Sequence, residues 1–194
     1  GSGRPASGIL VVCGSQHPGS KAQVEELEAR GWAVVYRLKA TQPEPVFEKT
    51  VDGEIGEISG AVAGDVAAAL SERSVVLAPK DDAFPESCED PAAIASALGA
   101  IAAKACEVRR PLGLHLSGGE TAYYVLKELG AHSIEIRGQI ADGVPWGRIE
   151  GGPLDGTLVV TKSGSFGAPE AITEALAAMR SISLVRGGND RRPA

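Results

Sequence analysis

The sequence predicts a single α/β domain with a three-layer architecture, in which a mostly parallel sheet carries helices on both faces. The first observation is a set of short, continuous apolar runs, which are typical of strands buried on both faces of a parallel sheet. The second is that three of these runs end in loops of small residues that lead into helical patterns. The third is the length of 194 residues, which suits one domain with a substantial core.

The first β-loop-α-β unit of such a sheet is legible at the start of the chain. Residues 9–13 form an uninterrupted apolar strand. Ser20 is the expected N-cap of a helix over residues 21–30, and Gly31 follows as its C′ residue. Residues 32–38 then read as the second strand, which completes the unit.

The next part of the chain is clear except for residues 41–59. Pro43 and Pro45 interrupt that segment, so we expect a connection there with at most a short edge strand. A helix, a strand, an acidic loop and a second helix are expected after it, at residues 64–73, 74–78, 79–91 and 92–106. Asp81 and Asp82 in the acidic loop either face the ligand-binding edge or belong to a solvated surface, and the solvated surface is favoured.

Strands and helices continue to alternate in the second half. The expected strands are residues 111–116, 133–140 and 158–161, and the expected helices are residues 121–129 and 169–180. Gly130 closes the first of these helices as its C′ residue. Residues 143–147 read as a turn-rich crossing, with a minor strand at 148–149, and residues 182–185 as a last short strand.

We therefore expect one domain over residues 4–186. Residues 1–3, Gly-Ser-Gly, read as an expression scar, and residues 187–194 read as a disordered tail.

The composition excludes several functional classes. Hydrophobic residues make up 43% of the chain and aromatic residues only 4%, so the core has to consist of Ala, Val, Leu and Ile. The formal net charge is −6, and no basic cluster interleaves with aromatic residues, which argues against nucleic acid as a partner. No stretch reaches the ~18 apolar residues of a membrane span, and no signal-peptide pattern is present. We expect a cytoplasmic location and no membrane partner.

The three cysteines do not indicate a disulfide framework or a zinc site. Cys13, Cys88 and Cys106 are widely spaced and odd in number. Cys13 lies in an apolar strand and Cys106 in a helical pattern, where buried structural thiols are expected.

Three loops of small residues should gather at one edge of the sheet, since each follows a strand. They are Gly14-Ser15, residues 117–121 and residues 162–167. Glycine lets a ligand approach the backbone, hydroxyl groups add donors, and the helix N-termini add partial positive charge. Any one loop needs Gly and Ser simply to turn and to cap a helix. Their joint occurrence, with Lys162 beside them, favours a site for a polyanion such as a nucleotide phosphate.

The usual nucleotide motifs are absent. Lys162-Ser163 is preceded by Thr161 and lacks the upstream glycine of a P-loop. No Gly-x-Gly-x-x-Gly stands between a strand and a helix, which counts against a Rossmann-type oxidoreductase. If ATP binds, it binds in another way.

The titratable residues near these loops admit two interpretations each. Glu120 at a helix start either caps backbone N–H groups or holds Mg²⁺ beside a triphosphate. His17, His115 and His132 are not at metal-ligand spacing. We expect His115 to be a satisfied core residue, whereas His17 either touches a ligand or is a solvated loop residue. No Ser/His/Asp or Cys/His grouping is present, and no metal ligand set is assigned.

Four motifs, taken in order and spacing, give a specific resemblance to a known family. Val-Val-Cys-Gly-Ser ending at Ser15, with Pro18 and Gln23, resembles the start of the nucleotide-binding C-terminal domain of the four-carbon acid-sugar kinases. The other three resemble its Gly-Gly-Asp/Glu-Thr element, its segment ending in Pro-Gly-Val-Pro and its Thr-Lys-x-Gly-x-Phe-Gly signature; they are residues 117–121, residues 139–147 and residues 161–167. The resemblance runs from about Ile9 to Met179, with small departures at Asp142 and Ser165.

The resemblance implies a kinase that transfers the γ-phosphate of ATP to a hydroxyl of a tetronate or 3-oxo-tetronate, with ATP and Mg²⁺ as its cofactors. By motif match the nucleotide-binding residues are Ser15, Gly118, Gly119, Glu120, Thr121, Lys162 and Gly164. It also implies that the acid sugar and the catalytic base belong to an N-terminal domain, in the same or a separate chain, so no catalytic residue is assigned here. This chain alone is then expected to bind ATP without catalysing transfer.

A non-catalytic nucleotide- or small-ligand-binding regulatory module is the alternative to a kinase domain. The acid sugar, the metal ligands and homo-oligomerisation are left open.

Overall fold

The computed structural model describes residues 8–39, 46–52, 54–59, 61–80 and 91–189. Several sequence-based expectations lie outside these ranges. They concern the expression scar, the start of the 41–59 segment, the acidic loop with Asp81, Asp82 and Cys88, and residues 190–194 of the expected tail.

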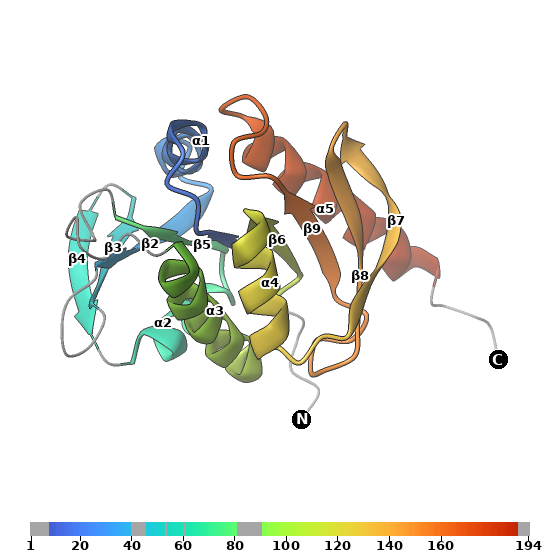
Figure 1. Cartoon of the computed structure of the whole chain (residues 1–194), viewed down its shortest axis with the longest axis horizontal. Helices are drawn as coiled ribbons and strands as arrows, with labels where there is room; N and C mark the ends of the chain where they lie inside the picture. Colours follow the sequence, from blue (N-terminus) through green and yellow to red (C-terminus); the bar gives the residue numbers. More distant parts are fainter. Residues whose placement is uncertain (1–7, 40–45, 53, 60, 81–90, 190–194) are drawn as a thin grey trace.

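The described residues form one nine-stranded sheet with the order β4-β3-β2-β5-β1-β6-β9-β8-β7 (Figure 1). Its strands are β1 (Ile9–Cys13), β2 (Ala33–Lys39), β3 (Val46–Val51), β4 (Glu54–Ser59), β5 (Ser74–Pro79), β6 (Gly113–Ser117), β7 (Ser133–Ala141), β8 (Val144–Glu150) and β9 (Leu158–Lys162). The five central strands, from β2 to β9, are parallel, and an antiparallel hairpin flanks them on each side.

Within the described ranges, five helices cover the two faces of the sheet. They are α1 (Pro18–Ala29), α2 (Val62–Ala69), α3 (Pro91–Val108), α4 (Gly119–Glu128) and α5 (Ala171–Asn189). α2, α3 and α4 pack on one face, and α1 and α5 pack on the other (Figure 1). This confirms the predicted three-layer α/β domain. Within the described part of the chain, no helix is both long enough and apolar enough to cross a membrane.

Alternation along β1 shows how one short strand serves both cores. All five of its residues are buried. Leu10 and Val12 face the core beneath α2, α3 and α4, whereas Ile9, Val11 and Cys13 face the core beneath α1 and α5. A strand covered on both faces has no polar side, which explains its continuous apolar sequence.

Two expectations about the sheet edges were wrong. Residues 46–51 and 54–59 form the antiparallel strands β3 and β4, where a connection with at most a short edge strand was expected. Residues 144–150 form the strand β8, which pairs with β7 and β9, whereas a turn-rich crossing was expected over residues 143–147 and a minor strand only at 148–149. Gly147, which suggested a turn, lies so close to the carbonyl of Glu135 in β7 that a Cβ would overlap it. The glycine therefore permits close strand approach.

The end of the chain also differs from expectation, because α5 continues through residues 182–185, where a strand was expected, to Asn189. Ser181 donates its hydroxyl to the carbonyl of Ala177 at 3.1 Å, and Ser183 donates to that of Met179 at 2.9 Å. Both serines thus bond back along their own helix, which removes their preference for a turn.

Candidate functional site

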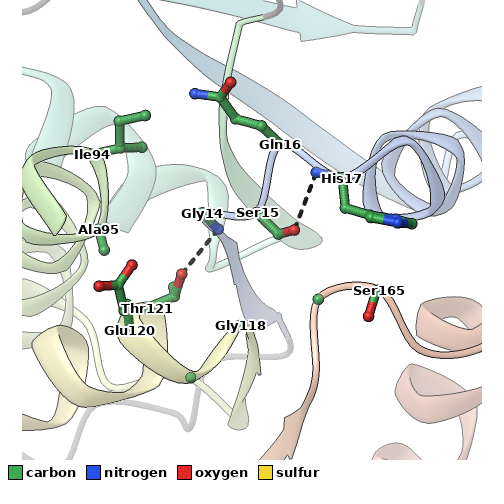
Figure 2. Close-up of a pocket in the computed structure, with 12 residues that line it drawn as sticks. Gly14, Ser15, Gln16, His17, Ile94, Ala95, Gly118, Glu120, Thr121 and Ser165 are labelled. Carbon is green, nitrogen blue, oxygen red and sulfur yellow. Dashed lines mark hydrogen bonds between the residues drawn. The ribbon is translucent and has the colours of Figure 1, made fainter. Parts of the chain in front are cut away.

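A cleft opens at the carboxyl edge of the parallel strands, where the loops after β1, β6 and β9 meet (Figure 2). Its volume is about 600 Å³, which lies in the range of small-molecule sites. One wall is apolar, because Ile94 and Ala95 near the start of α3 contribute to it. The rest of the lining comes from the three loops: residues 14–17, residues 118–121, Gly164 and Ser165.

The position of the cleft follows from the strand order. After β1 the chain crosses to β2 on one side, and it later returns to place β6 on the other side of β1. Loops that leave neighbouring strands in opposite directions separate and leave a crevice between them. The β1–β6 boundary is such a switch point, and both of its loops line the cleft.

The structure brings six of the seven predicted binding residues together. The residues that line the cleft are Ser15, Gly118, Gly119, Glu120, Thr121 and Gly164. Figure 2 shows Ser15 between the α4 residues on one side and the Ser165 loop on the other. Lys162, the seventh, does not line the cleft.

Close backbone approach explains two of the glycines. The Thr121 side-chain oxygen accepts the backbone N–H of Gly14 at 3.2 Å, which ties the β6–α4 loop to the β1 loop. A Cβ on Gly14 would overlap that oxygen. A Cβ on Gly164 would lie 2.5 Å from the Oγ of Ser15 and 2.6 Å from its Cβ. The three loops therefore form one packed unit.

Replacing Thr121 tests whether this unit depends on the Thr121–Gly14 hydrogen bond. Thr121→Val keeps the side-chain shape but removes the acceptor, so we expect a loss of about 1 kcal/mol in the free energy of unfolding and weaker ligand binding. Thr121→Ser keeps the acceptor and should bind ligand like the wild type. Urea denaturation and ligand titration measure the two effects. Equal ligand binding by the Val and Ser variants would contradict this role.

The start of α4 presents unpaired backbone donors to the cleft. Gly118, just before the helix, has φ of 105° and ψ of 135°, a conformation that favours glycine. The first helical hydrogen bond is donated by Ala122 to the Gly118 carbonyl at 2.9 Å. The N–H groups of Gly119, Glu120 and Thr121 have no acceptor among the described residues. Together with the helix dipole, they can bind an anion.

The start of α1 is different, because His17 already caps it. α1 begins at Pro18 with His17 as its N-cap, so the prediction that Ser20 caps this helix was wrong. The Nδ1 of His17 accepts the N–H of Gly19 at 3.1 Å, and its carbonyl accepts those of Ser20 and Lys21. The donors of α1 are thus occupied by its own cap. Exposed His17 still lines the cleft, as the ligand-contact interpretation requires.

Lys162 lies behind the cleft, although the sequence suggested a lysine at its lip. Only 5% of the residue is exposed. Its Nζ donates to the carbonyls of Ser163 at 2.9 Å and Gly164 at 3.4 Å. Burial lowers the pKa of this ammonium group. Alternation along β9 could have indicated this position, since Leu158 and Val160 face the same helices α1 and α5.

His115 is buried, as expected, but it is not satisfied. It lies in β6, between Val11 of β1 and Val160 of β9. Neither ring nitrogen has a hydrogen-bond partner within the described ranges. Burial, followed by the positive charge of Lys162, lowers the pKa of this imidazole to about 3. The missing partners could not be predicted from the sequence, because they depend on which side chains the sheet brings close.

Glu120 is exposed in the first turn of α4 and lines the cleft. No hydrogen bond of its carboxylate is found among the described residues, so the capping interpretation has no support. The hydroxyl groups of Ser15 and Thr121 line the same cleft. No group of three or more His, Cys, Asp or Glu side chains that could hold a metal occurs in the part of the chain described. The oxygen donors fit Mg²⁺, which usually takes one or two carboxylates and the phosphates of its substrate.

Some residues that line the cleft were not among the predicted binding residues. Ile94 and Ala95 form its apolar wall, and Gln16 lies beside His17 in the β1 loop. A signal for the first two was present, since α3 follows β5, whose carboxyl end lies at the same edge of the sheet.

A family model and curated proteins of similar sequence indicate the same family for this chain. A family model described as a nucleotide-binding C-terminal domain matches residues 10–172. The D-threonate kinase of Bordetella bronchiseptica is 30% identical over 181 residues, which cover 92% of this chain and 42% of that protein. The D-threonate kinase of Salmonella typhimurium is 28% identical over 181 residues, covering 87% of this chain and 41% of that protein. The chain thus spans less than half the length of these relatives.

Solved structures share the fold. A domain of unknown function from Bordetella bronchiseptica, described as a domain-swapped dimer with bound citrate, superposes with a TM-score of 0.70 at 26% identity. The match covers 92% of this chain and 42% of that one. A Haemophilus influenzae protein gives a TM-score of 0.61 at 21% identity, covers 91% of this chain and 41% of its own, and shows the fold alone.

Proposed function

This chain belongs to the family of the nucleotide-binding C-terminal domain of the four-carbon acid-sugar kinases, and from that membership we propose that its cleft binds ATP and presents the γ-phosphate to an acid sugar. Relatives that the chain matches are D-threonate kinases, and a D-erythronate kinase of Heliobacterium modesticaldum is 32% identical over 80 residues, 40% of this chain and 18% of that protein. A hydroxyl of a four-carbon sugar acid is therefore the proposed acceptor.

The observation that carries this proposal is the convergence of three small-residue loops on one cleft at the switch point of the sheet. The free N–H groups at the start of α4 face the same space as the hydroxyl groups of Ser15 and Thr121. A triphosphate needs many hydrogen-bond donors within a few ångströms of one another, and this arrangement supplies them from the backbone. Because the net charge of the chain is −6, its overall charge does not attract a polyanion, and backbone N–H donors have to bind the phosphates locally.

The two walls of the cleft suit the two ends of a nucleotide. We assign the phosphates to the loops of β1, β6 and β9, and the base to the apolar wall at Ile94 and Ala95. Glu120 is the proposed protein ligand of Mg²⁺, since it is the carboxylate in the described cleft lining. The metal would neutralise charge on the phosphate oxygens during transfer.

Phosphoryl transfer needs little covalent chemistry from the protein, because positioning and charge stabilisation dominate. In this proposal the domain holds the phosphate donor ATP, orients its phosphates and leaves the γ-phosphate accessible from the open cleft. We propose that the acid sugar and the base that removes its hydroxyl proton are supplied by a separate domain. Closure of that domain over the cleft would exclude water from the γ-phosphate.

Calorimetry tests the proposal directly. We expect the 194-residue chain to bind ATP–Mg²⁺ and ADP–Mg²⁺ at micromolar to millimolar concentration, and adenosine much more weakly, because the phosphates supply most contacts. The chain alone should not phosphorylate D-threonate. Absence of binding at millimolar nucleotide, with folding verified by circular dichroism, would overturn the proposal.

A phosphate-transfer assay and a thermal-shift assay separate the alternatives. A non-catalytic regulatory module would bind ATP but would still transfer no phosphate to a tetronate after addition of an acid-sugar-binding domain from a family member. An oxidoreductase would show a rise in melting temperature with NAD(H) and none with ATP.

A further inference from the structure

The side chain of Lys162 is directed at the backbone of the loop that follows it, and no part of the residue lines the cleft. We propose that Lys162 and Ser20 are positioning residues, which turn two peptide groups so that the N–H groups of Gly164 and Ser165 form an anion-binding pair. The identity of the anion as a nucleotide phosphate rests on the proposed function; the existence of the pair does not.

The Gly164 carbonyl is the centre of this arrangement. It accepts a hydrogen bond from the Ser20 hydroxyl, on the buried first turn of α1, and a second from the Nζ of Lys162 at 3.4 Å. In a trans peptide the C=O and the following N–H point in opposite directions. Since the carbonyl points to the buried side, the N–H of Ser165 points to the other side, where Gly164 and Ser165 line the cleft.

The preceding peptide group is held in the same way. The Ser163 carbonyl accepts a hydrogen bond from the Nζ of Lys162 at 2.9 Å, so the N–H of Gly164 points away from the lysine. Neither the Gly164 nor the Ser165 N–H has an acceptor among the residues that the structure describes. Two adjacent N–H groups turned to one side form a concave site for an anion.

Gln23 holds the rest of the loop in the same orientation. Its buried Nε2 group shares its two hydrogens among the carbonyls of Phe166 at 3.0 Å, Gly167 at 3.1 Å and Ala168 at 3.0 Å. Carbonyls from Ser163 to Ala168 are therefore held by buried donors of α1 and β9, Ser165 excepted. Such a loop is oriented before any ligand arrives, which reduces the entropic cost of binding.

Direct contact between the ammonium group of Lys162 and a phosphate is the competing explanation. For that contact the side chain would have to leave both carbonyls and pass the loop that separates it from the cleft. The two explanations differ over Ser20. Ser20 bonds the same carbonyl but carries no charge and lines no part of the cleft, so it matters only if orientation of the peptide matters.

Amide NMR of the ¹⁵N-labelled full chain tests the pair itself. Inorganic tripolyphosphate and ATP–Mg²⁺ are the two probes. We expect both to shift the Gly164 and Ser165 amide resonances downfield, as N–H groups that gain a charged acceptor do. Unchanged Gly164 and Ser165 resonances in the presence of bound ATP would overturn the inference and leave the proposed function standing. Shifts with tripolyphosphate but none with ATP would overturn the proposed function and leave the pair standing.

Variants test the positioning. Ser20→Ala should weaken ATP binding about tenfold, whereas Ser74→Ala should leave it unchanged. Ser74 is the matched control, because it is equally buried and its Oγ accepts two hydrogen bonds, from the Ile9 N–H and the Arg180 side chain, at the opposite edge of the sheet. Weaker ATP binding in both variants would indicate a general loss of stability and would contradict the proposal.

A double-mutant cycle decides between positioning and contact. Lys162→Met should also weaken ATP binding. Adding Ser20→Ala to the Lys162→Met variant should weaken binding much less than the tenfold expected for Ser20→Ala alone, since both residues act on one carbonyl. If the double variant loses affinity by the product of the two single losses, to within about twofold, the two residues act independently. That result would favour direct contact between Lys162 and a phosphate.

Discussion

Lowering the pH from 7 to 4.5 is expected to cost the folded chain roughly 3 kcal/mol through one side chain, His115. Burial, followed by the charge of Lys162, lowers its pKa from 6.5 to about 3 in the folded state. Below pH 6.5 the His115 imidazole is therefore protonated in the unfolded chain but stays neutral in the folded chain. Stability is lost as the pH falls, by about 1.4 kcal/mol per unit, until the pH approaches the folded value. Urea denaturation at a series of pH values measures this slope.

Two variants isolate the contribution of His115. His115→Leu removes the titrating group, so its free energy of unfolding should change little between pH 6.5 and 4.5. His132→Leu, at an exposed histidine between α4 and β7, is the control for replacing an imidazole outside the core. Carboxylates such as Glu28, whose pKa is lowered by the hydrogen bond from Arg37, contribute mainly below this window and in all three proteins. Identical slopes for His115→Leu and the wild type would contradict the assignment.

The parallel centre of the fold could be predicted from sequence because each of its features is local. A strand such as β1 is covered on both faces, so its sequence is apolar throughout. The meeting of the Gly14, Gly118 and Gly164 loops followed from the rule that parallel strands share a carboxyl edge. Six of the seven residues that the family motifs indicated lie in these loops and line the cleft.

The features that were missed depend on contacts between distant segments. Gly147 looked like a turn residue, and only its closeness to the Glu135 carbonyl explains it as part of a strand. His17 caps α1 through its own ring, a role that Ser, Thr, Asp or Asn normally takes. The burial of Lys162 was legible in the alternation along β9, but a lysine beside glycines suggested an exposed charge.

The second large effect is expected at Gly119: Gly119→Ala should weaken ATP binding roughly 100-fold, or about 2.7 kcal/mol, without destabilising the fold. Gly119 begins α4 with an ordinary φ, and a Cβ there meets nothing within 4 Å. A helical Cβ tilts toward the N-terminal end, which here is the cleft. The methyl group would hold a phosphate away from the N–H groups of residues 119–121, so their charge-assisted hydrogen bonds would be lost.

Gly64→Ala is the matched control for this experiment. Gly64 is also an exposed helical glycine whose Cβ would meet nothing within 4 Å, but it lies in α2 and outside the cleft lining. Alanine is favoured over glycine in helices, so both variants should melt at or above the wild-type temperature. Calorimetry with ATP–Mg²⁺ should show a loss only in Gly119→Ala. If Gly119→Ala is stable and binds ATP as tightly as the wild type does, the prediction is contradicted. The phosphates then do not approach the N–H groups of α4, because the added methyl group would keep them away.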